Sequence, residues 1–312
     1  MSKDHQAAIR VENLTKAYGA FRALRGIGFE VQRGEVFGFL GPNGAGKTTA
    51  IRCMLDLIRP SAGLLRVLGH DPQQEPVAVR ERCGYLPGEL RLDENITVNT
   101  ALGFFRELRG GGSACRRRAG ELSDRLELNT GSKIKNLSKG NKQKIGIVAA
   151  FMHEPELLLL DEPTSGLDPL VQQTVMDLVC EAQHGGATVF FSSHVLTEVQ
   201  SVAGRVAIIR NGRVVEVAAT SELSARGTVQ VRVVFADPDK VDVPQFDALP
   251  GVELINCGDG GRVLELAVNG TMDTLVKLLA QYPVEYLETR RGGLEEAFHS
   301  HYEGEREKAD QR

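Results

Sequence analysis

A glycine-rich stretch near residue 45 combines the residue types that bind a chain of phosphates. The sequence Gly-Pro-Asn-Gly-Ala-Gly-Lys-Thr at positions 41–48 matches the pattern of a phosphate-binding loop. Glycines let successive backbone N–H groups converge on phosphate oxygens without a side-chain clash. The pattern predicts a nucleoside triphosphate site, and the residues expected to contact the ligand are Gly41, Asn43, Gly44, Ala45, Gly46, Lys47, Thr48 and Thr49.

Two side chains of this loop carry specific chemistry. Lys47 is expected to reach the β- and γ-phosphates, and the hydroxyl of Thr48 is expected to ligate Mg²⁺. A GTP-binding protein would add an Asn-Lys-x-Asp motif that reads the guanine base. The Asn-Lys pair at 141–142 is followed by Gln143 and Lys144 and has no such aspartate, which counts against GTP.

Two adjacent carboxylates follow a run of four leucines at 157–160. The run is typical of a buried strand, and Asp161 and Glu162 stand at its carboxyl end, where α/β sheets bind ligands. Asp161 is expected to hold the Mg²⁺ ion, and Glu162 is expected to polarise the attacking water. The structural alternative is that the two acidic residues only cap the next helix.

Strands and helices must alternate around these motifs to position them. Residues 36–40 are continuously apolar, as in a strand covered on both faces, and residues 47–59 have a helical pattern that Pro60 ends. Further apolar strands are expected at 157–160 and 188–192, with a helix at 169–183 between them. Helices that alternate with apolar strands predict a mostly parallel sheet.

Other segments predict the parts that surround this sheet. Apolar residues alternate with polar ones in the first 40 residues, which indicates half-buried strands. Residues 72–150 are mostly helical in pattern. The two apolar runs at 206–209 and 214–217 flank Asn211-Gly212, the strongest short hairpin signal.

The last hundred residues have a different pattern. Strands are expected near 229–233, at 252–256, at 263–268 and at 284–287, with helices at 244–249 and 271–281; the order is β-α-β-β-α-β. Residues 216–312 contain 18 acidic and 10 basic residues, a net charge of −8, whereas residues 1–215 have a net charge of +4. The charge difference supports a domain boundary, and the predicted domains are 1–220 and 221–312.

Composition excludes several classes of protein. The chain has 312 residues, 42% of them hydrophobic, and a net charge of −4, which is too apolar and too weakly charged for a disordered chain. We expect no membrane-spanning segment, because no apolar run approaches the roughly 20 residues that a membrane helix needs. The start of the chain lacks the apolar stretch of a signal peptide. The five cysteines lie far apart, so no zinc pair or redox CxxC is expected.

Taken together, the ordered motifs resemble the ATP-binding subunits of ABC transporters. The resemblance covers about residues 8–220 and is strongest to exporter-type subunits, ABC-2-like and similar to multidrug and antibiotic exporters. It implies an α/β fold with a P-loop NTPase core, an N-terminal antiparallel β subdomain and a helical subdomain at about 86–150. The C-terminal part is expected to be a small α+β, ferredoxin-like domain with an accessory or regulatory role.

The resemblance also assigns roles to residues outside the first two motifs. Tyr18 matches the aromatic residue that stacks on adenine, and His194 matches the switch histidine that contacts the γ-phosphate. Ser138 and Gly140, within Leu-Ser-Lys-Gly-Asn at 137–141, match the signature loop that contacts the nucleotide of the partner subunit. Asp168 matches the loop that communicates across the dimer.

The chain departs from the family pattern between the first two motifs. A glutamine that contacts Mg²⁺ or water and senses the permease is expected here, but Gly88 stands at its place and Glu89 follows. Glu89 is a candidate substitute, although a carboxylate near the γ-phosphate is repelled unless Mg²⁺ screens it. Near the end of the chain, residues 294–298 resemble the closing helix of exporter-type subunits.

The resemblance implies an ATPase that powers export through a separate transmembrane permease. Two copies would enclose two ATP molecules with Mg²⁺, and Lys47, Glu162 and His194 would be the catalytic residues. The expected location is cytoplasmic, on the inner face of the cell membrane through the permease, with no nucleic-acid partner. One alternative is a soluble ABC-type ATPase that acts on nucleic acid or ribosomes. The other is a weakly hydrolysing regulatory subunit, which Gly88 suggests.

Overall fold

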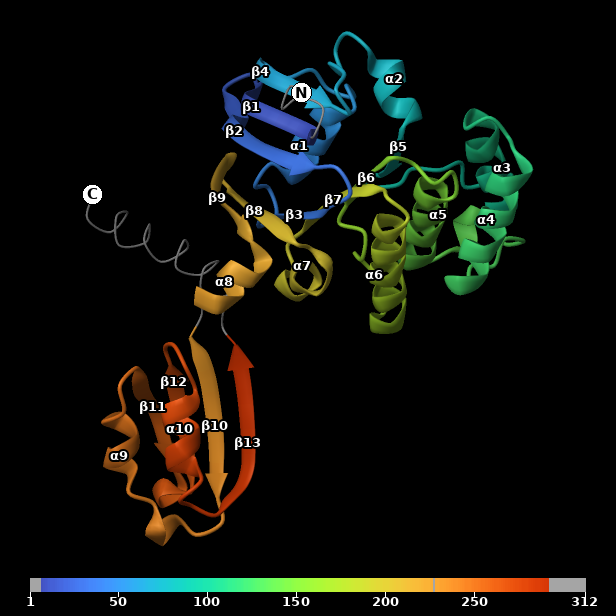
Figure 1. Ribbon diagram of the computed structural model, residues 1–312. Helices are drawn as coiled ribbons and strands as arrows, with labels where there is room; N and C mark the ends of the chain where they lie inside the picture. Colours follow the sequence, from blue (N-terminus) through green and yellow to red (C-terminus); the bar gives the residue numbers. More distant parts are fainter. Residues whose placement is uncertain (1–6, 227, 292–312) are drawn as a thin grey trace. The chain divides into compact units, whose positions relative to one another are not determined.

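Contacts divide the chain into two compact units, Met1–Ala219 and Thr220–Arg312 (Figure 1). The computed structural model describes residues 7–226 and 228–291, so the predicted helix at 294–298 lies outside the described residues. In the described part, every helix is too short or too polar to cross a membrane.

The first unit is built on a six-stranded sheet that is parallel except at one edge. Its strands, in spatial order, are β5 (Cys83–Leu86), β6 (Leu157–Asp161), β7 (Thr188–Ser193), β3 (Val36–Leu40), β8 (Arg205–Arg210) and β9 (Arg213–Ala219). β8 and β9 form the antiparallel hairpin predicted around Asn211-Gly212. All residues of β3, β6 and β7 are buried, as expected for central parallel strands. The predicted mostly parallel sheet is confirmed.

A second, three-stranded antiparallel sheet packs against the central one. It consists, in spatial order, of β2 (Phe21–Gln32), β1 (Ala7–Tyr18) and β4 (Ala62–Val67). The ring of Phe29 in β2 stacks on Phe37 of β3 at 5.7 Å and on Phe190 of β7 at 5.9 Å. This aromatic cluster joins the two sheets into one core.

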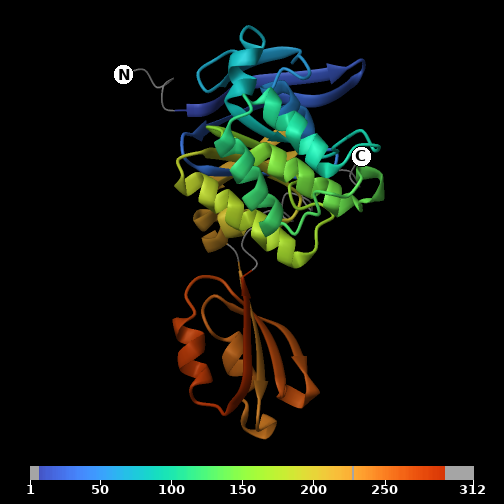
Figure 2. The same cartoon turned by 90° about the vertical axis from the view of Figure 1, so that its right-hand side faces the viewer.

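The helices of the first unit cover the central sheet and form a separate group beside it. They are α1 (Lys47–Met54), α2 (Pro76–Glu81), α3 (Val98–Leu108), α4 (Ser113–Arg125), α5 (Lys139–Phe151), α6 (Pro169–His184) and α7 (Leu196–Val202). Figures 1 and 2 show α3, α4 and α5 grouped together, and α5 contacts both of the others. The expected helical subdomain is therefore present.

Two local predictions differ from the structure. α1 ends at Met54 rather than at Arg59, because Asp56 adopts a left-handed backbone conformation with φ of 50°. β5 lies inside the stretch from 72 to 150 that was predicted as mostly helical. Its four residues are apolar or glycine, and they form a strand because they pair with β6, a partner more than 70 residues away in the sequence.

The second unit has the predicted β-α-β-β-α-β order. After α8 (Thr220–Arg226), its elements are β10 (Val229–Phe235), α9 (Val243–Asp247), β11 (Val252–Gly258), β12 (Val263–Val268), α10 (Asp273–Leu279) and β13 (Val284–Arg291). The strands form an antiparallel sheet in the order β11-β12-β10-β13. This is the arrangement of a small ferredoxin-like domain.

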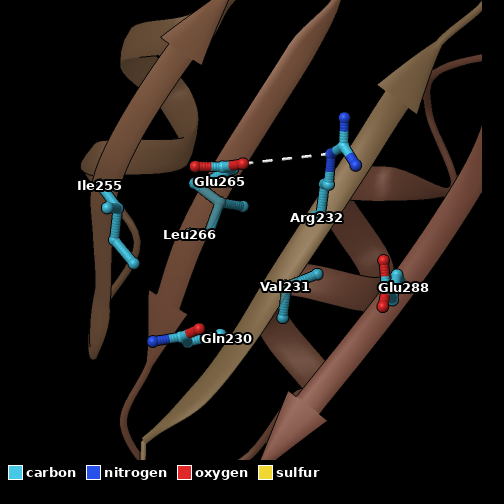
Figure 3. A pocket seen from close by; sticks show the side chains of 7 residues that line it. All are labelled: Gln230, Val231, Arg232, Ile255, Glu265, Leu266 and Glu288. Atoms are coloured by element: carbon cyan, nitrogen blue, oxygen red, sulfur yellow. Dashed lines mark ion pairs between the residues drawn. The ribbon is translucent and has the colours of Figure 1, made fainter.

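One face of the second sheet is buried by its helices and the other carries charge. Alternate residues of β10 and β12 pack with Phe246 of α9 and Leu275 of α10. Arg232 and Glu265 lie on the opposite face, 4.0 Å apart (Figure 3). The alternation follows from the period of two along a strand.

Phe246 lies at the centre of the core of the second unit. Phe246 is fully buried, and its ring lies 5.8 Å from that of Phe235 and 5.6 Å from that of Tyr282. Phe246→Ala is expected to lower the free energy of unfolding of this unit by about 3–5 kcal/mol, because it leaves a cavity. Hydrogen–deuterium exchange of peptides from residues 228–291 measures the loss of protection. Ile255→Ala, at a side chain that is 54% exposed, is the control, and equal protection in the two variants would contradict the prediction.

Candidate functional site

The phosphate-binding loop joins the end of β3 to the start of α1. Gly44 and Gly46 have positive φ angles of 79° and 114°, which residues with a Cβ rarely adopt. A Cβ at Gly41 would lie 2.4 Å from the carbonyl oxygen of Ile209, and a Cβ at Gly46 would lie 2.8 Å from that of Ala23. The glycines are therefore needed for the shape of the loop and for its close packing against β8 and β2.

Lys47 is held over this loop by three oxygen atoms. Its side chain is buried, and its Nζ donates hydrogen bonds to the carbonyl oxygens of Gly41, at 2.8 Å, and Pro42, at 3.2 Å. The same Nζ lies 3.1 Å from Oε1 of Glu162. A buried ammonium group needs such partners, because its desolvation is otherwise costly.

Glu162 lies between the other two predicted catalytic side chains. Its Oε1 contacts Lys47, and its Oε2 lies 3.3 Å from Nδ1 of His194. The backbone of Glu162 has a φ of 51°, and its N–H donates to the carbonyl oxygen of Ser192 at 3.2 Å. Residues that are more than 30 positions apart in the sequence thus form one cluster at the carboxyl ends of β3, β6 and β7.

Asp161 has an oxygen atom that suits a metal ion. The residue is fully buried, and its Oδ1 accepts a hydrogen bond of 2.7 Å from Oγ of Ser192. Among the described residues, nothing donates a hydrogen bond to Oδ2. A buried carboxylate oxygen without a partner is costly, and a hard cation such as Mg²⁺ prefers oxygen ligands. Asp161 and Thr48, which begins the first turn of α1 after Lys47, therefore fit the predicted metal site.

Predicted nucleotide contacts from separate segments line one cavity of about 260 Å³. Tyr18, at the end of β1, shares this cavity with Glu162 and with residues of the phosphate-binding loop. The ring of Tyr18 is 48% exposed, and Nζ of Lys16 lies 4.9 Å from its centre. Phe21, 63% exposed, lines the same cavity. Phe21 was not predicted from the sequence; the available signal was a second aromatic residue just across the turn from Tyr18.

The segment that departs from the family pattern lies directly beside Asp161. A Cβ at Gly88 would lie 3.1 Å from Oδ2 of Asp161. The side chain of Glu89 is 79% exposed and lies 3.7 Å from Arg91, so it does not take the place of the expected glutamine in this structure. Burial, and then the carboxylate of Asp161, raises the pKa of the Tyr85 phenol above its usual value, so Tyr85 stays neutral next to this site.

The signature loop and the loop at Asp168 lie apart from the cavity. Oγ of Ser138 accepts a hydrogen bond of 3.2 Å from the N–H of Asn141 at the start of α5. Oδ1 of Asp168 accepts one of 3.1 Å from the N–H of Val171 at the start of α6. Ser138, Gly140 and Asp168 are not among the residues that line the cavity. Gly41, Ala45, Asp161 and His194 do not line it either, but they belong to the phosphate-binding loop or lie next to Glu162.

These two loops nevertheless contact each other and the cluster around Glu162. A Cβ at Gly140 would lie 2.5 Å from the carbonyl oxygen of Gly166. Gln143, which is buried, donates hydrogen bonds to the carbonyl oxygens of Glu162, at 3.2 Å, and Pro163, at 3.4 Å. Gln143 was not predicted from the sequence, because no pattern around a single helical glutamine indicates its partner.

Known proteins that resemble this chain point to one family. Residues 24–165 match the model of the ABC transporter family. The daunorubicin resistance ATP-binding protein DrrA3 of Streptomyces coeruleorubidus is 36% identical over 300 residues, which cover 93% of this chain and 94% of that protein. The bacitracin transport ATP-binding protein BcrA of Enterococcus faecalis is 36% identical over 219 residues, which cover 70% of this chain and 71% of that protein.

Solved structures support the same fold. The structure of an ATP-binding subunit of an ABC transporter has a TM-score of 0.65 and 32% identity, and the match covers 69% of this chain and 91% of that chain. A dimeric ATP-binding cassette bound to ADP and Pi has a TM-score of 0.63 and 23% identity, and covers 68% of this chain and 98% of that chain. The second likeness concerns the fold alone.

The space between Gly88 and Asp161 is too small for a side chain at position 88 without a shift of the carboxylate. Gly88→Ala places a methyl group 3.1 Å from the unpaired oxygen of Asp161, so it is expected to weaken Mg²⁺ binding about 10-fold. The test is a titration with Mg²⁺ or Mn²⁺ at a fixed amount of nucleotide, which gives the metal concentration that half-saturates the protein. Gly120→Ala is the control, because a Cβ at that helical position meets no atom within 4 Å. An unchanged half-saturating concentration in Gly88→Ala would refute the predicted role of this segment.

Proposed function

The chain belongs to the ABC transporter family, and from this premise we propose that it is an ATP-binding subunit that hydrolyses ATP to power export through a separate permease. The convergence of Lys47, Glu162 and His194 beside a phosphate-binding loop is the observation that carries the proposal. The relatives named for daunorubicin resistance and bacitracin transport support export as the direction. The subunit would therefore lie at the inner face of the cell membrane, attached through the permease.

Residues that line the cavity and residues next to it share the chemistry. Backbone N–H groups of the loop from Gly41 to Thr48 bind the phosphates, and the ammonium group of Lys47 balances charge on the transferred phosphoryl group. Glu162 accepts a proton from the attacking water, and His194 orients the carboxylate and that water. When bound at Asp161 and Thr48, Mg²⁺ supplies additional positive charge next to the phosphates. Tyr18 stacks on the adenine base.

We propose that the complete site forms between two copies of the chain. Ser138 and Gly140 stand outside the cavity that contains Lys47, which fits a role toward the nucleotide of the partner subunit. Leu170, in the first turn of α6 after Asp168, is an apolar residue that is 82% exposed. A partner subunit would cover it. ATP would join the two copies, and hydrolysis would let them separate.

An apolar groove beside Gly88 is the proposed docking surface for a cytoplasmic segment of the permease. The groove, of about 490 Å³, lies between α2, α3, α5 and the segment after β5, and its lining includes Tyr85, Pro87 and Leu90. Two further lining residues, Val77 and Leu108, are 60% and 66% exposed. Because Pro87 precedes Gly88, where a Cβ would lie 3.1 Å from Oδ2 of Asp161, a segment seated in this groove is linked to the proposed metal site through adjacent backbone. This continuity favours the permease as the occupant.

The C-terminal unit is proposed to have an accessory or regulatory role. The match to DrrA3 covers 93% of this chain and therefore extends into the C-terminal unit. This extent supports the C-terminal unit as part of the functional subunit. The net charge of −8 over residues 216–312 disfavours binding to a nucleic-acid backbone, and the named relatives favour export over an action on nucleic acid. Glu162 in contact with Lys47 disfavours the alternative of a weakly hydrolysing regulatory subunit.

Removal of the proposed general base tests the catalytic assignment. Glu162→Gln is expected to lower the rate of phosphate release about 100-fold or more, because the amide cannot accept the proton. The same variant should accumulate as an ATP-bound dimer, which light scattering after gel filtration detects. Glu127→Gln is a matched control, because Glu127 is exposed and has the same positive φ of 51°. Wild-type turnover by Glu162→Gln would exclude Glu162 as the base.

A charge placed in the groove tests the permease surface. Leu108→Asp is expected to abolish co-purification with the permease, because it replaces an apolar contact by a carboxylate that is costly to remove from water. ATP hydrolysis by the isolated subunit should change less than about twofold, since surface substitutions away from the site have small effects. Leu64→Asp, at an exposed apolar residue of β4, is the control. Normal co-purification of Leu108→Asp would place the permease on another surface.

A further inference from the structure

Glu198, on α7, connects two loops of the catalytic cluster through its carboxylate. Its Oε1 accepts a hydrogen bond of 2.5 Å from Oγ1 of Thr164, and its Oε2 accepts one of 2.5 Å from Oγ of Ser193. Both hydroxyl groups belong to buried residues. Each of the two oxygens of one carboxylate is therefore engaged by a different loop, and hydrogen bonds to an ionised group are the strong ones.

The loop that begins at Ser193 carries His194. Ser193 is the last residue of β7, and its Oγ also accepts a hydrogen bond of 2.9 Å from the N–H of Val195. The hydroxyl of Ser193 thus bonds to residues on both sides of the turn: it donates to Glu198 and accepts from Val195. His194 lies between Ser193 and Val195 in the sequence. This arrangement fixes the turn from which the imidazole reaches Glu162.

The loop that contains Thr164 carries Glu162 and continues toward Asp168. Thr164 stands two residues after Glu162, and its carbonyl oxygen accepts a hydrogen bond of 3.1 Å from the N–H of Leu167. The same loop includes Gly166, whose carbonyl oxygen packs against Gly140 of the signature loop. A shift of Thr164 would therefore move both the proposed base and the segment that faces the partner subunit.

We propose that Glu198 is a positioning residue that holds the His194 loop and the Glu162 loop in register for ATP hydrolysis. The proposal rests on the proposed ATPase function and deepens it. Glu198 lies in the α7 helix and acts through Thr164 and Ser193, not on the nucleotide. Its loss lets the separation between His194 and Glu162 vary, and misplacement by about 1 Å is enough to slow a catalysed step strongly.

A purely structural role is the competing explanation. Glu198 lies in the first turn of α7, where a negative charge stabilises the helix through its dipole. That role needs only the charge, and it does not involve the hydroxyl of Thr164. Thr164→Val removes one hydrogen bond to Glu198 and leaves the charge at the helix start unchanged. The two explanations therefore predict different results for this variant.

The experiment measures phosphate release by the full chain over a range of MgATP concentrations. For Glu198→Ala, kcat is expected to fall about 10- to 100-fold, with KM and the Kd for ADP unchanged within about twofold. Glu198→Gln and Thr164→Val should each give an intermediate kcat. The double variant Thr164→Val/Glu198→Ala should be no slower than Glu198→Ala, because both substitutions break the same connection.

Controls separate this proposal from the ATPase assignment and from misfolding. Glu222→Ala changes an exposed acidic residue in the first turn of α8 and should keep the wild-type kcat. If the wild-type chain hydrolyses ATP and Thr164→Val has the wild-type kcat, the positioning role is wrong while the ATPase function stands. Absence of hydrolysis by the wild-type chain would instead overturn the proposed function. If Glu198→Ala fails to fold, Thr164→Val decides the outcome. A melting temperature close to that of the wild-type chain shows that Thr164→Val is folded.

Discussion

The buried ammonium group of Lys47 is the constraint on which the rest of the site depends. A charge removed from water costs several kcal/mol unless oxygen atoms surround it. Here those atoms are the carbonyl oxygens of Gly41 and Pro42 and the carboxylate of Glu162. The carbonyls can turn toward Lys47 only if the loop curls back on itself. The curl in turn requires glycine at positions such as Gly46, where the backbone has a positive φ and Ala23 is close.

The same constraint explains why the sheet order matters. Glu162 can reach Lys47 only if the strand that ends at Asp161 lies close to β3, and β7 separates the two. In the register of this sheet, Leu40 is paired with Ser193 and Asp161 with Ser192. The residues that follow these strand ends, including Glu162 and His194, therefore emerge at one edge. The covered, apolar strands hold this register, and the polar side chains meet where the strands stop.

The sequence was sufficient for the parts of the site that have a local pattern. The phosphate-binding loop follows from its glycine spacing, and Asp161 and Glu162 follow from four buried residues before two carboxylates. Both motifs end strands of a parallel sheet, so their proximity could be predicted. The β10–β13 sheet could be predicted in the same way, from alternation at a period of two. The end of α1 at Met54 could not, because it depends on the backbone conformation of Asp56.

Contacts between distant side chains carry no such pattern. Gln143 and Glu198 each lie on a helix, and each has a partner far away in the sequence: Glu162 is 19 residues from Gln143, and Thr164 is 34 residues from Glu198. Only the folded chain shows these contacts. Both side chains bond to the loop that runs from Glu162 to Asp168, which is thereby connected to α5 through Gln143 and to α7 through Glu198. Glu198 also bonds to Ser193 at the end of β7.

Gly88 is the reverse case, since the family pattern predicts a side chain that this chain lacks. With only a hydrogen atom at that position, the segment after β5 approaches Asp161 through its backbone. Movement of the groove at Pro87 would therefore reach the proposed metal site by displacement of the main chain. In the proposed function, a chain without the expected glutamine would couple the proposed permease surface to Asp161 through the backbone at Gly88, where a Cβ would lie 3.1 Å from the carboxylate.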